Sequence, residues 1–192
     1  MNLQQSDLFG GPPLPEGFVY APEFITRTQE QALLAAIQGL TLEDARYKEY
    51  TAKRRVAYFG FDYDFSSNAL GEAPPLPDFL LPLRDSMARW MTIEPAALVQ
   101  ALVAEYRPGT PLGWHRDAPN FERLGGVSLG GWAKMRLRPY QGTSKEKPLV
   151  LDLAPRSAYQ MQGNARWRWQ HSIPATRELR YSITFRTLVR KD

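Results

Sequence analysis

The residues best suited to chemistry lie in Gly113-Trp114-His115-Arg116-Asp117 and, far downstream, at His171; the chain has only these two histidines. In an extended strand, the side chains at positions i and i+2 point to the same face, so His115 and Asp117 are expected to project together. With a second imidazole from a distant strand, they would form the facial triad of a non-haem Fe(II) site, which leaves coordination positions open.

Other interpretations of these three residues stay open. Zinc accepts the same imidazole and carboxylate ligands. A histidine and an aspartate two positions apart also occur as structural polar groups that hold no metal. The residues that follow His171 favour the metal interpretation.

The run Arg180-Tyr181-Ser182-Ile183-Thr184-Phe185-Arg186 alternates strictly between polar and apolar side chains, which predicts a strand. Its four polar residues then share one face. One interpretation is an ordinary half-exposed strand with a solvated basic face. The other is a row of donors for an anion with two carboxylates, because guanidinium binds a carboxylate through two hydrogen bonds and stays charged.

In this order, His115-x-Asp117, His171 and Arg180-x5-Arg186 resemble the AlkB-type branch of the 2-oxoglutarate- and Fe(II)-dependent dioxygenases. The resemblance extends to Tyr106-x-Pro108-Gly109 and to the glycine-bounded stretch 125–129, and it covers residues 105–188. It implies a double-stranded β-helix (jelly roll) and an enzyme that uses Fe(II), 2-oxoglutarate and O2.

The resemblance also implies roles for the triad. His115, Asp117 and His171 would hold Fe(II) and form the catalytic centre. Enzymes of this branch that repair DNA hydroxylate a methyl group on a base nitrogen, which releases formaldehyde, while 2-oxoglutarate becomes succinate. A base inside a duplex cannot reach such a site, so it must be flipped out or already single-stranded.

Four residues are implied in binding 2-oxoglutarate. Arg186 would pair with the carboxylate near the metal, and Arg180, aided by Ser182 and Tyr106, would hold the far carboxylate.

Two positions depart from the family pattern. Ala104 stands where repair enzymes often carry an asparagine that binds the co-substrate. Pro119 stands where they can carry an acidic residue that recognises a base amino group.

Periodicity predicts one helix over 29–38, capped by Thr26 or Thr28 and ended by Gly39, and a second over 79–91. Alternating or apolar runs predict strands over 97–106, 112–117, 127–129, 134–138, 148–153, 157–162, 166–171 and 180–188, with Gly163-Asn164 as a hairpin turn. Trp167 and Trp169 would share the face of His171. This order predicts a mainly β sandwich or barrel with flanking α-helices, and periodicity alone does not single out a jelly roll.

We expect a single domain of 192 residues. It would consist of an N-terminal arm (1–20) that contains the breaker cluster Gly10-Gly11-Pro12-Pro13, a helical support with a substrate lid (21–95), and the catalytic jelly-roll core (96–192).

Two basic and aromatic stretches are candidates for binding nucleic acid. In 53–63, Lys53, Arg54 and Arg55 precede several aromatic residues, and Arg54, Phe61 and Tyr63 are candidate substrate contacts in the lid. In 134–138, three basic residues alternate onto one face, where Arg138 is a further candidate. The alternative for both stretches is a solvated basic surface beside core residues.

Composition limits the remaining possibilities. The chain is 43% hydrophobic and 23% charged with a formal net charge of +4, which suits a globular protein and permits a polyanionic partner. It contains no cysteine, which excludes disulfides and thiolate ligands. No signal peptide or membrane-spanning run is visible, so we expect a soluble, cytoplasmic protein without a membrane partner. We also expect a monomer.

Three rival functions remain. In the first, the same oxygenase chemistry acts on a protein, lipid or small molecule, which Ala104 and Pro119 favour. A cupin-type metal-binding sandwich would give no reason for the pair Arg180 and Arg186. A plain nucleic-acid-binding module would leave the placement of the triad residues to coincidence.

Overall fold

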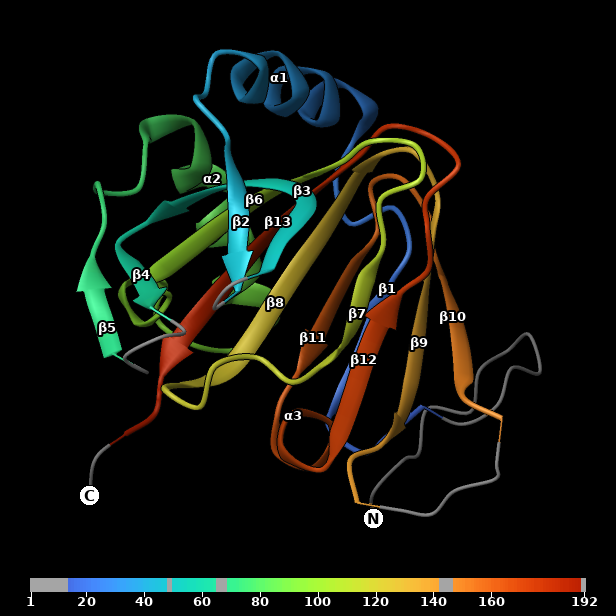
Figure 1. The fold of residues 1–192 in the computed structure, drawn as a ribbon. Helices are drawn as coiled ribbons and strands as arrows, with labels where there is room; N and C mark the ends of the chain where they lie inside the picture. The colour runs from blue at the N-terminus through green and yellow to red at the C-terminus, as the bar shows by residue number, and fades with distance from the viewer. Residues whose placement is uncertain (1–13, 48–49, 65–68, 142–146, 191–192) are drawn as a thin grey trace.

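The computed structural model describes residues 14–47, 50–64, 69–141 and 147–190. Within these ranges the largest element is an antiparallel sheet of seven strands (Figure 1). In spatial order the strands are β1 (Phe18–Ala21), β11 (Ala158–Met161), β8 (Phe121–Gly130), β13 (Arg180–Leu188), β6 (Gln100–Tyr106), β3 (Tyr50–Phe59) and β2 (Glu43–Tyr47).

Across the same described ranges, a second antiparallel sheet has four strands, in the order β10 (Leu149–Leu153), β9 (Ala133–Pro139), β12 (Trp169–Ile173) and β7 (Leu112–His115). A third, small sheet pairs β4 (Phe61–Asp64) with β5 (Ala69–Glu72). The helices are α1 (Arg27–Gln38), α2 (Leu81–Trp90) and α3 (Gly163–Trp167), with 3-10 turns η1 (Asp78–Leu80) and η2 (Pro95–Ala97).

Two apolar clusters hold these layers together. On one face of the large sheet, α1 and α2 bury Leu33, Ile37 and Met87 against strand residues that include Val127 and Ile183. On its other face, a second cluster joins the large sheet to the four-stranded sheet; it includes Leu124, Met135, Leu137, Met161 and Ile173. The predicted mainly β fold with flanking helices is therefore confirmed.

The chain order of the strands gives the jelly-roll connectivity. The last strand, β13, lies between β8 and β6, and β12 lies beside β7, although about fifty residues separate the last two in the chain. The pairing of β12 with β7 sets His171 opposite His115. The two predicted imidazole ligands can bind one metal only if strands this distant in sequence lie side by side, as β7 and β12 do.

Helix α1 begins as its sequence predicts. The Gln29 backbone N–H donates to Thr26 Oγ1 at 3.2 Å, and the Thr26 backbone N–H donates to Gln29 Oε1 at 2.8 Å. This reciprocal pair satisfies two helix-end donors that would otherwise depend on water. Gly39 ends the helix, and Leu33 and Ile37 face the core.

Strand β13 occupies its predicted range, but it is buried on both faces. Tyr181, Ile183 and Phe185 pack toward the helices. The polar residues of the alternation face the space between the sheets, and Arg180 is only 2% exposed. The interpretation of this strand as half-exposed with a solvated basic face is therefore wrong.

The predicted hairpin turn at Gly163-Asn164 is also wrong, because the chain forms the short helix α3 there. Gly163 has φ +52°, and the Ala165 N–H donates to the carbonyl of Glu16 at 2.9 Å. The predicted strand over 166–171 begins only at Trp169. Trp169 therefore alternates with His171 onto one face of β12, and Trp167 belongs to the helix.

The N-terminal half contributes directly to the large sheet. Strand β1 pairs with β11, and β3 pairs with β6. Of the predicted arm, residues 1–13, including Gly10-Gly11-Pro12-Pro13, lie outside the described residues, and the division at 20/21 and 95/96 stays a prediction. None of the helices in the described residues is long and apolar enough to cross a membrane.

Candidate metal centre and active site

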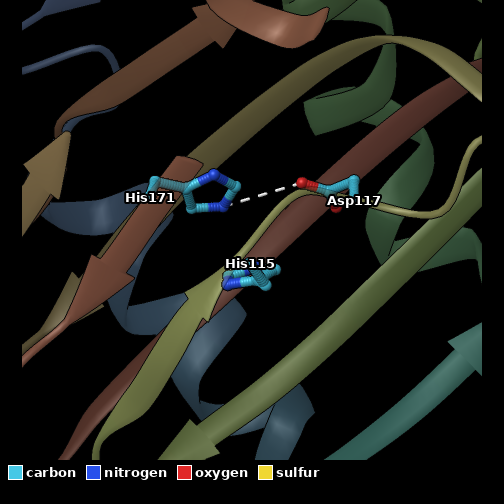
Figure 2. A group of neighbouring side chains, drawn as sticks. All are labelled: His115, Asp117 and His171. Atoms are coloured by element: carbon cyan, nitrogen blue, oxygen red, sulfur yellow. Dashed lines mark ion pairs between the residues drawn. The ribbon is translucent and has the colours of Figure 1, made fainter. Parts of the chain in front are cut away.

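Three side chains from β7, from the loop that follows it and from β12 converge on one point. His115 ends β7, Asp117 follows two residues later, and His171 lies in β12 (Figure 2). One ligand atom from each lies within 4.8 Å of the others. The predicted strand 112–117 stops at His115, so Asp117 reaches the cluster from the loop that follows the strand.

Hydrogen bonding orients the first imidazole. His115 Nδ1 lies 2.9 Å from the carbonyl oxygen of Gly113. Because a carbonyl only accepts, Nδ1 carries the proton and Nε2 keeps its lone pair for a metal. His171 turns Nε2 toward Asp117 Oδ2 at 3.6 Å, and its buried Nδ1 has no hydrogen-bond partner among the described residues.

The surroundings of the three side chains favour neutral imidazoles and an ionised carboxylate. Burial lowers the pKa of His171 to about 3, with a further contribution from His115. Burial also lowers the pKa of His115. Burial alone would raise the pKa of Asp117, but the Arg186 guanidinium and the two imidazoles hold it well below its usual range. Two neutral imidazoles and one carboxylate are the forms that bind a divalent cation.

The donor set fits Fe(II). Two nitrogen ligands and one oxygen ligand are grouped on one side of a cavity, so further coordination positions remain available. Zinc would accept the same ligands, and the geometry of the three side chains alone does not separate the two ions.

A small inner cavity adjoins the triad and is lined by the polar face of β13. Arg180 donates from Nε to Ser128 Oγ at 2.9 Å, whereas its buried Nη1 has no partner among the described residues. Tyr106 lies beside it, 5.0 Å from the Arg180 guanidinium carbon to the ring centre. Ser182 completes the predicted group. An unpartnered buried guanidinium nitrogen fits an anionic ligand, because burial without an acceptor is costly.

Arg186 contacts the metal cluster itself. Its Nε and Nη2 donate to Asp117 Oδ1 at 3.0 and 2.6 Å. Its Nη1 donates to Gln100 Oε1 at 2.9 Å. All three guanidinium nitrogens of Arg186 therefore have partners. Arg186, which is predicted to bind the carboxylate of 2-oxoglutarate near the metal, also positions the metal ligand Asp117.

A larger cavity of about 790 Å³ opens beside the triad. Of the four candidate substrate contacts, the structure places Arg54 and Tyr63 in its lining. Phe61 and Arg138 are not among the lining residues that the structure describes. Arg138 instead lies on the outer face of β9, where its guanidinium carbon is 4.2 Å from the centre of the Trp114 ring.

Arg54, in β3, is half-buried. It lines both cavities, and its Nε has no hydrogen-bond partner among the described residues. The adjacent Arg55 points away and forms a two-point ion pair with Glu105, at 2.9 and 3.0 Å. The predicted basic cluster therefore divides, because alternation along β3 sends neighbouring arginines to opposite faces.

Sequence reasoning missed two residues of the site. Arg166, in α3, is 2% exposed and donates to the backbone carbonyls of Asp117, Ala118 and Phe121 at 2.7 to 3.1 Å. Tyr159 lines the inner cavity, where burial raises its pKa to about 12. Neither stands in a motif, and Arg166 lay within a run that alternates like a strand.

The two departures from the family pattern also face the cavities. Ala104 lines the inner cavity and stands opposite Ser182 in the strand register. Pro119 lines the larger cavity. The methyl group of Ala104 brings no hydrogen bond to the inner cavity, and the Pro119 side chain brings none to the larger one.

Several known proteins are similar to this chain. An Arabidopsis thaliana protein named "Alkylated DNA repair protein ALKBH8 homolog" is 31% identical over 184 residues, covering 82% of this chain and 51% of that protein. A Macaca fascicularis protein named "tRNA (carboxymethyluridine(34)-5-O)-methyltransferase ALKBH8" is 28% identical over 169 residues, covering 83% of this chain and 24% of that protein. The chain thus spans about half the length of the first relative and about a quarter of the second.

The fold also has a counterpart among solved structures. The structure of OsALKBH1 matches with a TM-score of 0.70 and 16% identity, covering 91% of this chain and 99% of that one. At this identity the match shows a shared fold. The model of the 2OG-Fe(II) oxygenase superfamily matches residues 17–186. The chain therefore belongs to the 2OG-Fe(II) oxygenase superfamily, as an AlkB-type, Fe(II)- and 2-oxoglutarate-dependent dioxygenase.

Proposed function

We propose that this enzyme oxidatively dealkylates N-alkylated bases in nucleic acid, with decarboxylation of 2-oxoglutarate to succinate and release of formaldehyde. The observation that carries the proposal is the cavity of about 790 Å³ beside the triad. Its lining combines aromatic residues such as Tyr58, Tyr63 and Trp114 with Lys53 and Arg54, which suits a planar base on a phosphate backbone.

The names of the relatives support nucleic acid as the substrate class. One relative is named for alkylated DNA repair and another for a tRNA modification. The formal net charge of +4 agrees with a polyanionic substrate. The size of the cavity agrees with a single extruded or unpaired base.

In this proposal His115, Asp117 and His171 hold the metal. When bound, Fe(II) with 2-oxoglutarate and O2 supplies the oxidant that hydroxylates the N-alkyl group. The chain's own contribution is orientation: Arg186 fixes the Asp117 carboxylate at 2.6 Å, and the Gly113 carbonyl fixes the His115 ring at 2.9 Å. Preorganised ligands of this kind raise metal affinity and fix which side of the metal remains open.

The inner cavity would receive the co-substrate. Arg180 presents its unpartnered Nη1 to the far carboxylate, with Tyr106 and Ser182 as neutral donors beside it. Arg54 adds a third guanidinium to the same cavity, and its Nε is also unpartnered. We infer that Arg54 replaces part of the anion binding that Ala104 does not provide.

One alternative is the same oxygenase acting on a protein, a lipid or a small molecule. Pro119 favours it, because this position in the larger cavity lacks a carboxylate that would recognise a base amino group. The basic and aromatic lining of the cavity favours nucleic acid.

The test is a panel of single-stranded DNA and RNA oligonucleotides, each with one N-methylated base, incubated with Fe(II), 2-oxoglutarate and air. We expect at least one to lose its methyl group by mass spectrometry, with formaldehyde and succinate formed in equal amounts. The His115→Ala variant is the control and should form neither product. Succinate formation with every methylated base unchanged would favour the alternative substrates.

A further inference from the structure

Arginines and aromatic rings interleave along β7 and β9 of the four-stranded sheet and in the residues that follow these two strands. The Arg138 guanidinium carbon lies 4.2 Å from the Trp114 ring centre, and that of Arg136 lies 5.0 Å from the same ring. The Arg116 guanidinium carbon lies 3.5 Å from the Tyr140 ring centre. We name this group of five residues the basic face.

The stacked arginines are held in place by neutral partners. Arg138 Nε donates to Gln170 Oε1, and Arg136 Nε donates to Ser172 Oγ, each at 3.0 Å. Arg116 Nη1 donates to the carbonyl of Trp167 at 3.0 Å. No carboxylate in the described part of the chain forms an ion pair with any of the three. Among the described residues these three charges therefore have no ion-pair partner, and other guanidinium nitrogens remain available to an anion.

Carboxylates are scarce around the basic face. Within the described strands of the four-stranded sheet, the one acidic residue is Asp152, and it already pairs with Lys134 at 2.6 Å. A guanidinium binds phosphate and carboxylate equally well through two hydrogen bonds, but the aromatic rings between these arginines also offer surfaces on which bases stack. The surface therefore fits a single-stranded nucleic acid better than an acidic peptide.

The basic face is continuous with the active-site cavity. Trp114, Arg116, Arg136 and Tyr140 line the same cavity as His115 and Asp117. Strand β7 lies at the edge of its sheet, so the cavity can open past this edge onto the outer face. A substrate strand whose reacting group lies at the triad would therefore leave the cavity over these arginines.

We propose that the basic face binds the phosphodiester backbone of the single strand that flanks the target base. This inference rests on the proposed function and extends it, because it assigns part of the substrate's affinity to the rim of the cavity and to Arg138 outside it. The exposed ring of Tyr140 and the half-buried ring of Trp114 would add stacking surfaces for flanking bases.

The test measures binding alone, without turnover. A labelled, unmethylated single-stranded oligonucleotide, in DNA and RNA forms, is titrated with wild-type protein and with the Arg116→Gln/Arg138→Gln variant over a range of salt concentrations. Each phosphate contact on a single strand contributes about 0.7 to the slope of log affinity against log salt, so we expect the slope to fall by about 1.4. The affinity should fall by roughly tenfold near 0.1 M salt.

A matched variant controls for net charge. Arg27→Gln/Arg89→Gln removes two exposed arginines from α1 and α2, on the far side of the large sheet, and should keep the wild-type slope. Arg116→Lys/Arg138→Lys keeps the charges and should keep most of the slope, which separates lost charge from damage to the sheet.

Equal losses in the two Gln variants would mean a general charge effect and would overturn the assignment. Wild-type protein that binds no oligonucleotide would also overturn it. Because no methylated base is needed, failure of the demethylation test leaves this measurement valid. If the wild-type protein demethylates a substrate but Arg116→Gln/Arg138→Gln keeps the wild-type salt dependence, the proposed role of the basic face is wrong and the proposed function stands.

Discussion

Arg166 is a buried cation whose hydrogen bonds go to backbone carbonyls. It donates to the carbonyls of Asp117 and Ala118 in the loop after β7 and to that of Phe121 at the start of β8, and its guanidinium carbon lies 4.2 Å from the Trp167 ring centre. Asp117 lies beyond the end of β7, so strand pairing does not fix its position. Arg166 takes over this task by tying the loop to α3.

We therefore expect Arg166→Met to weaken metal binding by about 10- to 100-fold, as loss of a supporting contact does in other metal sites. The free energy of unfolding should fall by about 3 kcal/mol, because buried carbonyls lose their donors. Metal titration and chemical denaturation measure the two effects. Arg168→Met, at an exposed neighbour, should change neither, and wild-type metal affinity in Arg166→Met would refute the role.

The two histidines give a direct test of the electrostatics. The pKa of His171 in the folded protein, about 3, lies below its ordinary value of 6.5. Between these values the unfolded chain binds more protons than the folded one, so stability falls as the pH falls through this window. For His171 alone, metal-free protein should be less stable at pH 5 than at pH 7 by about 2 kcal/mol.

NMR resolves the same prediction without denaturant. Because the chain has two histidines, their ring C–H signals can be assigned with a single variant. The His171 signal of the folded, metal-free protein should stay constant from pH 8 to about pH 5. A midpoint near 6.5 would show a solvated imidazole and would contradict the buried cluster.

At the scale of elements, β13 carries two arginines that have different partners. Arg180 and Arg186 are six positions apart on one face, yet Arg180 reaches the inner cavity with an unpartnered nitrogen while Arg186 is bonded to Asp117. The alternation of this strand was visible in the sequence. The different partners of Arg180 and Arg186 could not be predicted from the sequence, because they depend on which neighbouring residues each side chain reaches in the folded protein.

Arg180→Gln is expected to weaken 2-oxoglutarate binding by about a hundredfold, the loss of a charge-assisted two-point contact, with metal binding nearly unchanged. Arg186→Gln should weaken both, because the Asp117 carboxylate loses its partner. Anaerobic titrations of Fe(II) and of 2-oxoglutarate measure the two affinities separately. Equal losses of both ligands in Arg180→Gln would make Arg180 a structural residue.

Elements with strong local signals were predicted well, and those that depend on distant contacts were not. Helix α1 starts at the Thr26 cap, and β13 occupies Arg180–Leu188, as the sequence indicates. Helix α3 was missed because Gly163-Asn164 is equally typical of a turn. What makes it a helix is the anchoring of Ala165 and Arg166 to remote backbone groups, which no local pattern records.

At the scale of the whole molecule, the fold brings the three ligands together. The register of β12 with β7 sets His171 opposite His115, and it exists only because the strands follow a jelly-roll path. Periodicity predicted a mainly β fold with flanking helices. The path itself followed from the resemblance of motifs, because many sandwich topologies share the same alternation.

The four candidate substrate contacts do not all face the same space. Arg54 and Tyr63 line the larger cavity, whereas Phe61 and Arg138 are not among its lining residues, and their contact with substrate stays a prediction. Alternation along a strand gives the face of a side chain, but it does not give which neighbour covers that face. For Arg138, the neighbour is Trp114, on the outer side of the sheet.

The most direct test of the metal centre is an anaerobic titration of the metal-free protein with Fe(II) in the presence of 2-oxoglutarate, followed by visible absorption. We expect a weak charge-transfer band that saturates at one iron per chain, and its absence in His171→Ala and Asp117→Ala variants that remain folded. A band of equal intensity in those variants, or none in the wild-type protein, would contradict the assignment of His115, Asp117 and His171 as the iron ligands.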